Sequence, residues 1–354
     1  MTRLVELRSD TFTLPTDEMR QAMAAAELGD DVWDEDPTVH RLQRRAAEMV
    51  GKEASLFIPS GTMGNLCALL AHTQPGDEVL VEAESHIFIS EVAGAAVVGG
   101  LQLRPLTTPE GRLKPDQVRA ALREPDIHEP HSALLCLENT HNRQGGICLS
   151  ARETREVAGV AHAAGMKVHL DGARIFNAAV AQQVDVRELT EPVDSVMFCL
   201  SKGLSAPVGS MLAGSAAFVQ QARRRRKMLG GGMRQAGVLA AAGLYALDRM
   251  VDRLAEDHAN ARRLGEGLQG IPAIEIDLSR IESNMVFGNC QPPLSAREFI
   301  ERCRQEGVLL DQASPQRWRM VTHRGVSAAE VDYAIEAIRR LMGSKPLEAL
   351  QATA

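Results

Sequence analysis

The hydrophobic and polar positions of this chain fall into two patterns that alternate along its length. Short apolar runs are typical of buried strands, and they occur at 55–58, 78–81, 101–106, 133–138, 168–170, 195–200 and 209–213. Between them, longer segments repeat apolar residues every three or four positions, as Val39, Leu42, Ala46 and Met49 do before Gly51. This alternation predicts an α/β fold with a mostly parallel sheet and helices on both of its faces.

The carboxyl-terminal part of the chain has a different pattern. A helix is expected after Gly214, the glycines at 230–232 interrupt it, and the pattern then predicts one long helix from Met233 to about Leu268. From Pro272 onward, strands at 273–277, 285–289 and 318–321 accompany helices at 296–305 and 328–341. We therefore predict an N-terminal arm over 1–18, a large domain over 19–250, and a small α/β domain over 251–354 that includes part of the long helix.

Composition restricts the class of protein and its partners. The chain has 354 residues, of which 45% are hydrophobic and 24% charged, as is typical of soluble globular proteins. A net charge of −7 argues against nucleic acid or an anionic membrane as the main partner. The first residues, MTRLVELRSD, contain no apolar signal core, and no apolar run has membrane-spanning length. We expect a cytoplasmic protein.

Two residue patterns have structural interpretations. The cysteines form no C-x-x-C pair, so we expect reduced, mostly buried thiols at Cys67, Cys136, Cys148, Cys199, Cys290 and Cys303. The basic run Arg223–Lys227 predicts a solvated helix face, with a contact to an anionic cofactor as the alternative.

Two ionisable residues follow the ends of neighbouring apolar runs. Asp171 ends the run at 168–170, and Lys202 follows the run at 195–200. Ligands of open α/β sheets bind at the carboxyl ends of the strands. There, a lysine can form a Schiff base with pyridoxal 5'-phosphate (PLP), and an aspartate can hold the proton on the pyridine nitrogen. A structural salt bridge at the sheet edge is the alternative interpretation.

Other segments add weaker signals. Ser60, Gly61 and Thr62 lie between a strand and a helix, where backbone N–H groups and the helix dipole favour an anion, although many ordinary helices begin in this way. His86 can stack on an aromatic cofactor or cap a turn. Ser9 lies in a polar, turn-rich segment and is explained equally well as a cap residue.

Taken together, several motifs closely resemble those of the low-specificity L-threonine aldolases, PLP enzymes of fold type I in the aspartate-aminotransferase-like group. They occur in family order between about residues 4 and 340, and they are LRSDT, GDDVWDEDP, PSGTMGN, ESHIF, LENTHN, HLDGARIFNA, CLSKGLSAPVGS, RKMLGGGMRQAG and RMVTH. The resemblance implies a mostly parallel seven-stranded sheet in the large domain and retro-aldol cleavage of L-threonine, L-allo-threonine and other β-hydroxy-α-amino acids to glycine and an aldehyde. It also implies a homotetramer, a dimer of dimers with shared sites, in threonine catabolism and glycine biosynthesis.

The same resemblance implies roles at the cofactor. Lys202 would carry PLP, Asp171 would pair with the pyridinium, and His86 would lie against the ring. The residues expected around the cofactor's phosphate are Gly61 and Thr62, with Lys227 and Arg234 from a neighbouring subunit.

The implied substrate site contains two arginines. Arg174 and Arg319 would hold the substrate carboxylate together with Ser9, since a guanidinium supplies two parallel N–H bonds to a carboxylate. The resemblance implies a contact of Arg174 with the cofactor as well. Arg317 is interpreted as structural. His128 matches a family histidine near the substrate hydroxyl, although His131 competes for that match.

The sequence leaves several choices open. The base is His86 or His128, acting directly or through water. Trp33 stands where the family often has tyrosine, which removes a phenolic hydroxyl. No acidic cluster requires a metal, although a structural cation near SKGLSAPVGS is conceivable by analogy. The alternatives are another PLP reaction on the same fold, β-elimination or transamination, and a non-catalytic scaffold.

Overall fold

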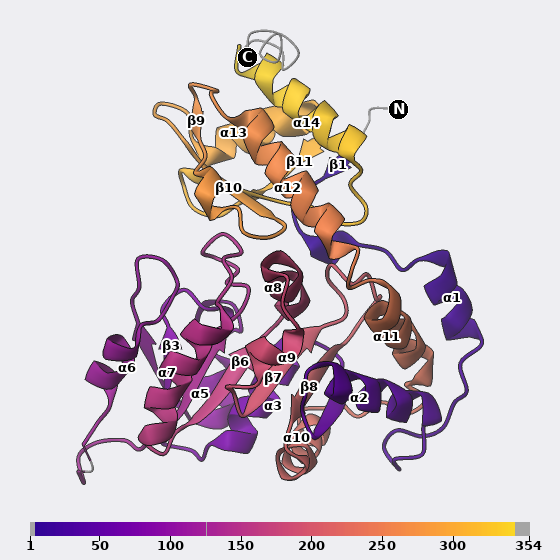
Figure 1. Ribbon diagram of the computed structural model, residues 1–354, viewed down its shortest axis with the longest axis vertical. Coiled ribbons are helices and arrows are strands. Elements are labelled where there is room, and N and C mark those ends of the chain that lie inside the picture. The colour runs from indigo at the N-terminus through magenta and orange to yellow at the C-terminus, as the bar shows by residue number, and fades with distance from the viewer. Residues whose placement is uncertain (1–3, 125, 344–354) are drawn as a thin grey trace.

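A seven-stranded sheet forms the centre of the larger part of the molecule (Figure 1). The computed structural model describes residues 4–124 and 126–343, so the ends of the predicted arm and small domain lie outside the described residues. The strand order is β2 (Ala54–Ile58), β8 (Ser210–Gly214), β7 (Ser195–Cys199), β6 (Lys167–Asp171), β5 (Ser132–Glu138), β3 (Glu78–Glu82) and β4 (Gln102–Leu106). β8 runs in the direction opposite to the other six strands, which confirms the predicted, mostly parallel sheet.

Both faces of this sheet are covered, which explains why its strands are almost continuously apolar. On one face lie α3 (Gly61–His72), α5 (Gly94–Gly99) and α10 (Ala216–Met228). The other face and its flank carry α2 (Pro37–Met49), α6 (Pro115–Ala121), α7 (Ala151–Ala163), α8 (Ile175–Gln182), α9 (Val186–Thr190) and α11 (Gly237–Arg249). Successive strand residues alternate between the two cores: Leu56 and Ile58 pack toward α3 and α10, and Phe57 toward α2.

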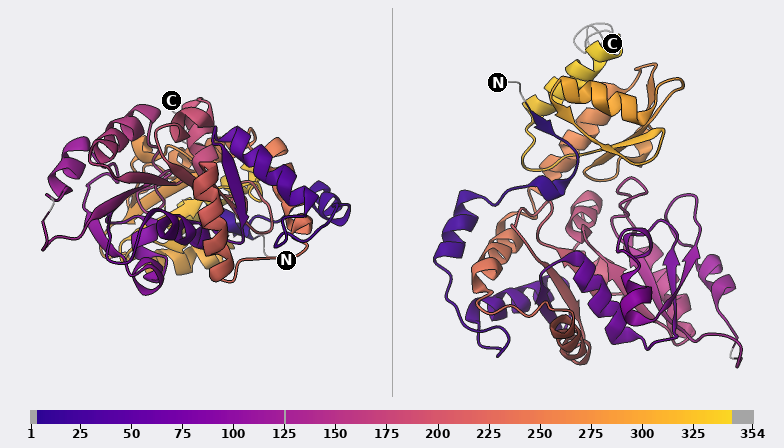
Figure 2. Two further views of the ribbon diagram at one scale, coloured as in Figure 1. Left: turned by 90° about the horizontal axis from the view of Figure 1, so that it is seen from below. Right: turned by 180° about the vertical axis from the view of Figure 1, so that it is seen from behind.

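A second, smaller apolar core surrounds an antiparallel sheet of order β12 (Asp311–Gln312), β13 (Arg317–Val321), β10 (Met285–Cys290) and β9 (Ile274–Glu275). The helices around it are α12 (Leu254–Leu268), α13 (Ala296–Gln305) and α14 (Ala328–Leu341), with the short 3-10 helix η2 (Leu278–Arg280) nearby. Figures 1 and 2 show this layer beside the large sheet, with α12 leading into it. The exact domain boundaries stay a prediction.

The N-terminal segment connects the two cores. β1 (Val5–Glu6) pairs in parallel with β11 (Val308–Leu309), and Val5 and Leu7 are buried in the smaller core. The chain then forms the 3-10 helix η1 (Asp10–Phe12) and α1 (Asp17–Ala24), which packs against α11. Between them, the Thr13 hydroxyl donates to the Lys202 carbonyl oxygen at 2.8 Å. The arm therefore lies on other structure, as its polar, turn-rich sequence indicates.

The prediction of one helix from Met233 to Leu268 is wrong. The structure has two helices, α11 and α12, and the chain turns between Met250 and Arg253. No glycine or proline marks this break, so the helical pattern continues through it. The break has a tertiary cause: α11 packs on α1 and α2, whereas α12 packs on α8 and α14.

The basic run at the end of α10 is not a solvated face throughout. Arg226 is 2% exposed, and its guanidinium lies 2.7 Å from Asp31 Oδ2. Burial lowers the pKa of Arg226 and outweighs the opposing charge of Asp31. Arg223 pairs with Asp34 at 2.7 Å. The expectation that Arg223 to Arg226 are surface residues is therefore wrong for Arg226, because the acidic loop before α2 packs against this helix.

All six cysteines are free and buried, which confirms their interpretation as reduced, buried thiols. Within the described residues, no helix combines the length and the apolar character that crossing a membrane requires.

Candidate active site

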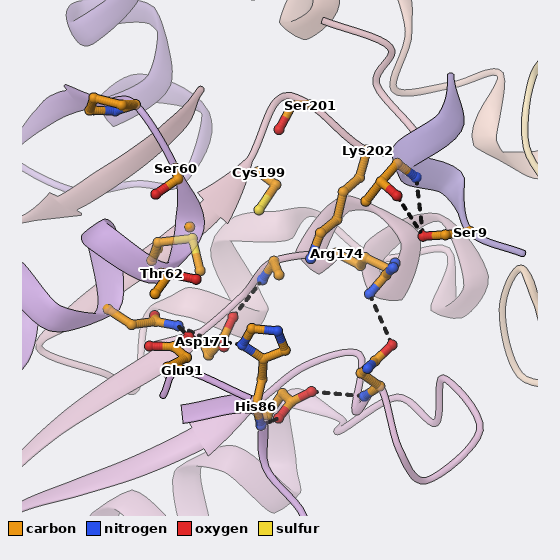
Figure 3. Close-up of a pocket in the computed structure, with 18 of the residues that line it drawn as sticks. Ser9, Ser60, Thr62, His86, Glu91, Asp171, Arg174, Cys199, Ser201 and Lys202 are labelled. Carbon is orange, nitrogen blue, oxygen red and sulfur yellow. Dashed lines mark hydrogen bonds and ion pairs between the residues drawn. The ribbon is translucent and has the colours of Figure 1, made fainter. Parts of the chain in front are cut away.

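A cavity of about 330 Å³ opens at the carboxyl ends of the central strands (Figure 3). It is the place where residues of the large sheet, the N-terminal arm and β13 meet. The predicted site residues that line it are Ser9, Gly61, Thr62, His86, Asp171, Arg174, Lys202 and Arg319. Residues as far apart as Ser9 and Arg319 thus face one space.

Asp171 and Lys202 enter this cavity from the ends of neighbouring parallel strands (Figure 3). Asp171 is 2% exposed; its Oδ1 accepts from the Ala173 N–H at 3.1 Å and its Oδ2 from Asn65 Nδ2 at 2.9 Å. Burial, together with the charges of Glu138 and Glu91, raises the pKa of Asp171 to about 6. A cation bound against this carboxylate would lower that pKa and keep the group ionised.

The amino end of α3 forms a second wall. Ser60 caps the helix, and its hydroxyl accepts from the Met63 N–H at 3.2 Å. The first N–H groups of a helix have no partners within it and favour an anion together with the helix dipole. A Cβ atom on Gly61 would lie 3.0 Å from Cys199 Sγ, so glycine allows the helix to begin directly against β7.

His86 is held by two carboxylates. Its Nδ1 lies 2.9 Å from Glu91 Oε1, and its backbone N–H donates to Glu138 at 2.7 Å. The bond to Glu91 raises the pKa of His86, with burial opposing it. Because Glu91 engages Nδ1, Nε2 is the ring nitrogen left for other partners. Asn65 donates to Glu91 at 2.8 Å as well as to Asp171, and so joins the two carboxylates.

Two guanidinium groups converge near Asn142. Arg174 forms a bidentate ion pair with Asp10, in which both hydrogen bonds are 2.7 Å long. Burial alone would raise the pKa of Asp10, but Arg174 holds it well below its usual range. Arg319 donates to Asn142 Oδ1 at 3.1 Å and to Asp311 at 2.9 Å.

Arg319 has an unused hydrogen-bond donor, whereas each guanidinium nitrogen of Arg174 has a partner. Burial, followed by the charge of Arg174, lowers its pKa. Its Nε is buried and has no hydrogen-bond partner. An anionic group between Arg174 and Arg319 would supply both the missing acceptor and the opposite charge.

Sequence reasoning missed three of the residues that build this site. Glu91 lies in a segment without a clear periodic pattern, and Asn65 carries no signal beyond its place in the PSGTMGN motif. Asp10 lies beside Ser9 in the same polar, turn-rich segment, although it anchors Arg174 across 164 positions. Ser9 fits both of its interpretations, because it caps η1 and also lines the cavity.

Three predicted residues do not reach the cavity of their own chain. His128 is exposed and lies 2.7 Å from Asp126, while Lys227 is exposed at the end of α10. Arg234 is exposed and pairs with Asp30 at 3.0 Å. His131, which competed with His128, is also exposed, near Asp77. Roles for these residues at an active site require a neighbouring subunit and stay predictions.

Arg317 and Trp33 both lie outside the lining of the cavity. Arg317 stacks over the Phe287 ring at 4.4 Å and does not line the cavity, in keeping with a structural role. Trp33 is 73% exposed, so in a single chain its indole is not packed against the cavity.

One group of three potential metal ligands occurs in the part of the chain that the structure describes. His86, Glu91 and Asp171 place their ligand atoms within 4.8 Å of one another. Both carboxylates already accept from Asn65, so protein donors hold them. The expectation that no metal binds stays a prediction.

Comparisons with known proteins point to one family. The family described as Beta-eliminating lyase matches residues 6–291. Low-specificity L-threonine aldolase 1 of Arabidopsis thaliana is 42% identical over 346 residues, which cover 96% of this chain and 97% of the relative. Low specificity L-threonine aldolase of Escherichia coli (strain K12) is 44% identical over 329 residues, 93% of this chain and 96% of the relative. The solved threonine aldolase of Leishmania major has a TM-score of 0.83 at 20% identity, covers 95% and 98% of the two chains, and shows a shared fold.

Proposed function

The chain belongs to the beta-eliminating lyase family and, within it, to the low-specificity L-threonine aldolases, and we propose from this that it binds PLP and cleaves L-threonine and L-allo-threonine to glycine and acetaldehyde. Other β-hydroxy-α-amino acids would give glycine and the corresponding aldehyde. The observation that carries the proposal is that one cavity holds Lys202, Asp171 and two arginines.

The residues of the cavity fit PLP by their chemistry. An amine, a buried carboxylate and a helix amino end match the cofactor's aldehyde, ring nitrogen and phosphate. Lys202 would hold the aldehyde carbon, Asp171 the protonated ring nitrogen, and Gly61 and Thr62 the phosphate. When bound, PLP supplies a conjugated ring that accepts the electron pair released as a bond at the substrate Cα breaks.

Arg174 and Arg319 select which bond breaks by orienting the substrate. Asp10 fixes the guanidinium of Arg174, and Asn142 accepts from both arginines, so the two cations present a rigid pair of donors. With Ser9, they would hold the substrate carboxylate in one orientation, which fixes which bond at Cα is presented for cleavage. A planar guanidinium fixes orientation as well as charge.

His86 is the base that the geometry supports best. With Nδ1 held by Glu91, Nε2 can take the proton of the β-hydroxyl directly or through water. Such positioned proton transfer contributes roughly 10²–10⁴-fold in rate. His128 stays the second candidate, because its exposed side chain would have to come from a neighbouring subunit.

We propose a homotetramer, a dimer of dimers, with active sites shared between subunits. The exposure of Lys227, Arg234 and His128 in the single chain is consistent with their serving a neighbour's site. The enzyme would act in the cytoplasm, in threonine catabolism and glycine biosynthesis, on a small amino acid rather than on nucleic acid or membrane.

A product assay with L-threonine, L-allo-threonine and phenylserine tests the reaction. We expect equal amounts of glycine and aldehyde from each substrate. Pyruvate or 2-oxobutyrate with ammonia, or dependence on a keto acid, would instead identify β-elimination or transamination.

The Lys202→Ala variant tests the cofactor assignment. We expect loss of turnover, because the amine that holds the cofactor is gone, and loss of the lysine label that borohydride reduction leaves in the native enzyme. Threonine cleavage at a near-native rate in this variant would contradict the assignment.

A further inference from the structure

A line of buried polar side chains continues behind the active site, away from the cavity. From the inside outward it consists of Asn65, His169, Ser195 and His72. His169 Nε2 lies 3.1 Å from Asn65 Oδ1, and His169 Nδ1 lies 2.9 Å from Ser195 Oγ. Ser195 Oγ is in turn 2.8 Å from His72 Nε2. His169 and Ser195 are fully buried, and so is Asn65 at 1% exposure.

The backbone explains why these four residues align. Asn65 and His72 lie seven positions apart on α3, so they point from the same helix face toward the sheet. His169 of β6 and Ser195 of β7 are paired across neighbouring strands. Asp171 follows His169 by two positions and therefore lies on the same side of the sheet.

The inner end of the line has only one consistent arrangement of hydrogens. Asn65 Nδ2 donates to Asp171 at 2.9 Å and to Glu91 at 2.8 Å, which uses both of its hydrogens on acceptors. Its Oδ1 therefore faces His169 and must accept. His169 Nε2 is thus the protonated ring nitrogen.

The outer end follows from the neutrality of both histidines. Burial, with the charge of His72 adding to it, lowers the pKa of His169 to about 3, and burial lowers the pKa of His72 to about 4. A neutral His169 that donates through Nε2 accepts through Nδ1, so Ser195 donates to it. Ser195 Oγ then accepts from His72 Nε2, whose ring is also stacked on Phe218 at 4.4 Å. All donors point toward the carboxylates.

We propose that His72, Ser195 and His169 are positioning residues, together called the lock, that hold the Asn65 amide in one orientation. In that orientation the amide donates to Asp171 and Glu91 together. The inference rests on the proposed PLP site. A reversed amide would turn its oxygen toward two carboxylates, and a loosely held one would leave Asp171 with the Ala173 N–H as its remaining donor. The charged groups that face Asp171 are Glu138, Glu91, His86 and Lys202.

The lock acts on the cofactor through the basicity of Asp171. A donor to the ionised carboxylate lowers its proton affinity, so the proton stays on the cofactor's ring nitrogen. Without the lock, Asp171 would draw that proton toward itself, and the ring would lose positive charge. The cofactor would then bind more weakly and accept electrons less well, while the substrate carboxylate would still meet Arg174 and Arg319.

His169→Leu removes the donor to Asn65 at nearly constant side-chain size. Loss of a buried hydrogen bond of this kind corresponds to about a tenfold change in an equilibrium or rate. We expect the PLP dissociation constant to rise about tenfold and kcat to fall about tenfold, with KM for threonine unchanged. The pH at which the visible band of the bound cofactor titrates should shift upward, because the ring carries less positive charge.

Three companion variants separate the lock from simple packing. His169→Gln places an amide donor where Nε2 lies. The PLP dissociation constant, kcat and the titration of the visible band should therefore stay at their native values. Ser195→Ala should weaken PLP binding and lower kcat, but less than His169→Leu does. In the His169→Gln background the same change should have no effect. The amide N–H of glutamine donates to Asn65 without help from Ser195, whereas histidine donates there only when its proton is on Nε2. Ser55→Ala removes a buried hydroxyl that donates to the Gln43 carbonyl oxygen outside this line, and should leave the cofactor constants unchanged.

The outcomes distinguish this inference from the proposed function. If the native protein binds PLP and cleaves threonine, but His169→Leu or Ser195→Ala changes stability without moving cofactor affinity or the titration of the band, the lock is refuted. If Ser195→Ala acts equally in both backgrounds, the line is structural packing and the lock is likewise refuted. A native protein that neither binds PLP nor forms glycine overturns the proposed function itself. Should His169→Leu fail to fold, Ser195→Ala in the two backgrounds decides the question.

Discussion

At the scale of single residues, Asp10 determines where Arg174 can point. Asp10 is fully buried, and both of its oxygens accept from Arg174 at 2.7 Å. Asp10→Asn leaves the guanidinium without its counter-charge. Breaking a buried ion pair by removing one partner typically costs about 3–5 kcal/mol of stability. We therefore expect a lower unfolding free energy and a higher KM for threonine, measured by denaturant unfolding and by kinetics.

The same carboxylate predicts a dependence of stability on pH. Its pKa in the folded protein lies below the unfolded value of about 3.9, so the ion pair contributes fully at pH well above 4. The contribution is lost as the pH falls through the folded-state pKa. Melting temperature should therefore decline with acid more steeply in the native protein than in Asp10→Asn. Parallel curves for the two proteins would show that Asp10 is not the group responsible.

Arg319 and Arg317 form a matched pair on β13, two positions apart. Arg319 lines the cavity with a buried, unpartnered Nε, whereas Arg317 stacks on Phe287. Arg319→Ala should raise KM for threonine by about tenfold or more, as expected for loss of a charged hydrogen bond, with PLP retained. Arg317→Ala should leave KM near the native value. The reverse result would move the substrate carboxylate to the other arginine.

At the scale of elements, the contact between α3 and β7 places the helix amino end at the cavity. In Gly61→Ala, the new methyl group would lie 3.0 Å from Cys199 Sγ and 3.3 Å from Met197 Cε, so the helix start must shift. We expect weaker PLP binding, measured by equilibrium dialysis. Gly159→Ala on α7 is the control, because its methyl group meets nothing within 4 Å. That change should leave PLP binding intact and stabilise the helix by about 0.5–1 kcal/mol.

At the scale of the whole molecule, the proposed shared sites can be tested by mixing two inactive variants. Lys202→Ala lacks the cofactor amine, and Arg234→Ala lacks a phosphate contact that we expect a neighbouring subunit to supply. In a hybrid dimer, one of the two sites receives both native residues. Unfolding and refolding the variants together should therefore restore part of the activity, whereas each refolded alone stays inactive. No recovery in verified hybrids would place Arg234 outside a shared site.

The apolar pattern was enough to locate the seven strands of the large sheet along the chain and to place Asp171 and Lys202 at the ends of two of them. Those features are local: the apolar period decides strand or helix over a few residues, and each ionisable residue follows the end of its own strand. The motifs likewise located Arg174, His86 and Ser60 to Thr62, because each lies beside a strand or helix end that its own neighbours define. Eight of the residues expected at the site line one cavity, and they are Ser9, Gly61, Thr62, His86, Asp171, Arg174, Lys202 and Arg319.

Packing between elements fixes which distant side chains hold these residues. The anchor of Arg174 by Asp10 spans 164 positions, and the bond from Asn65 to Asp171 spans 106. The burial of Arg226 against Asp31 and the break between α11 and α12 also depend on packing between elements. Local periodicity cannot encode such contacts, because a residue's burial and hydrogen-bond partners are fixed only when the elements pack together.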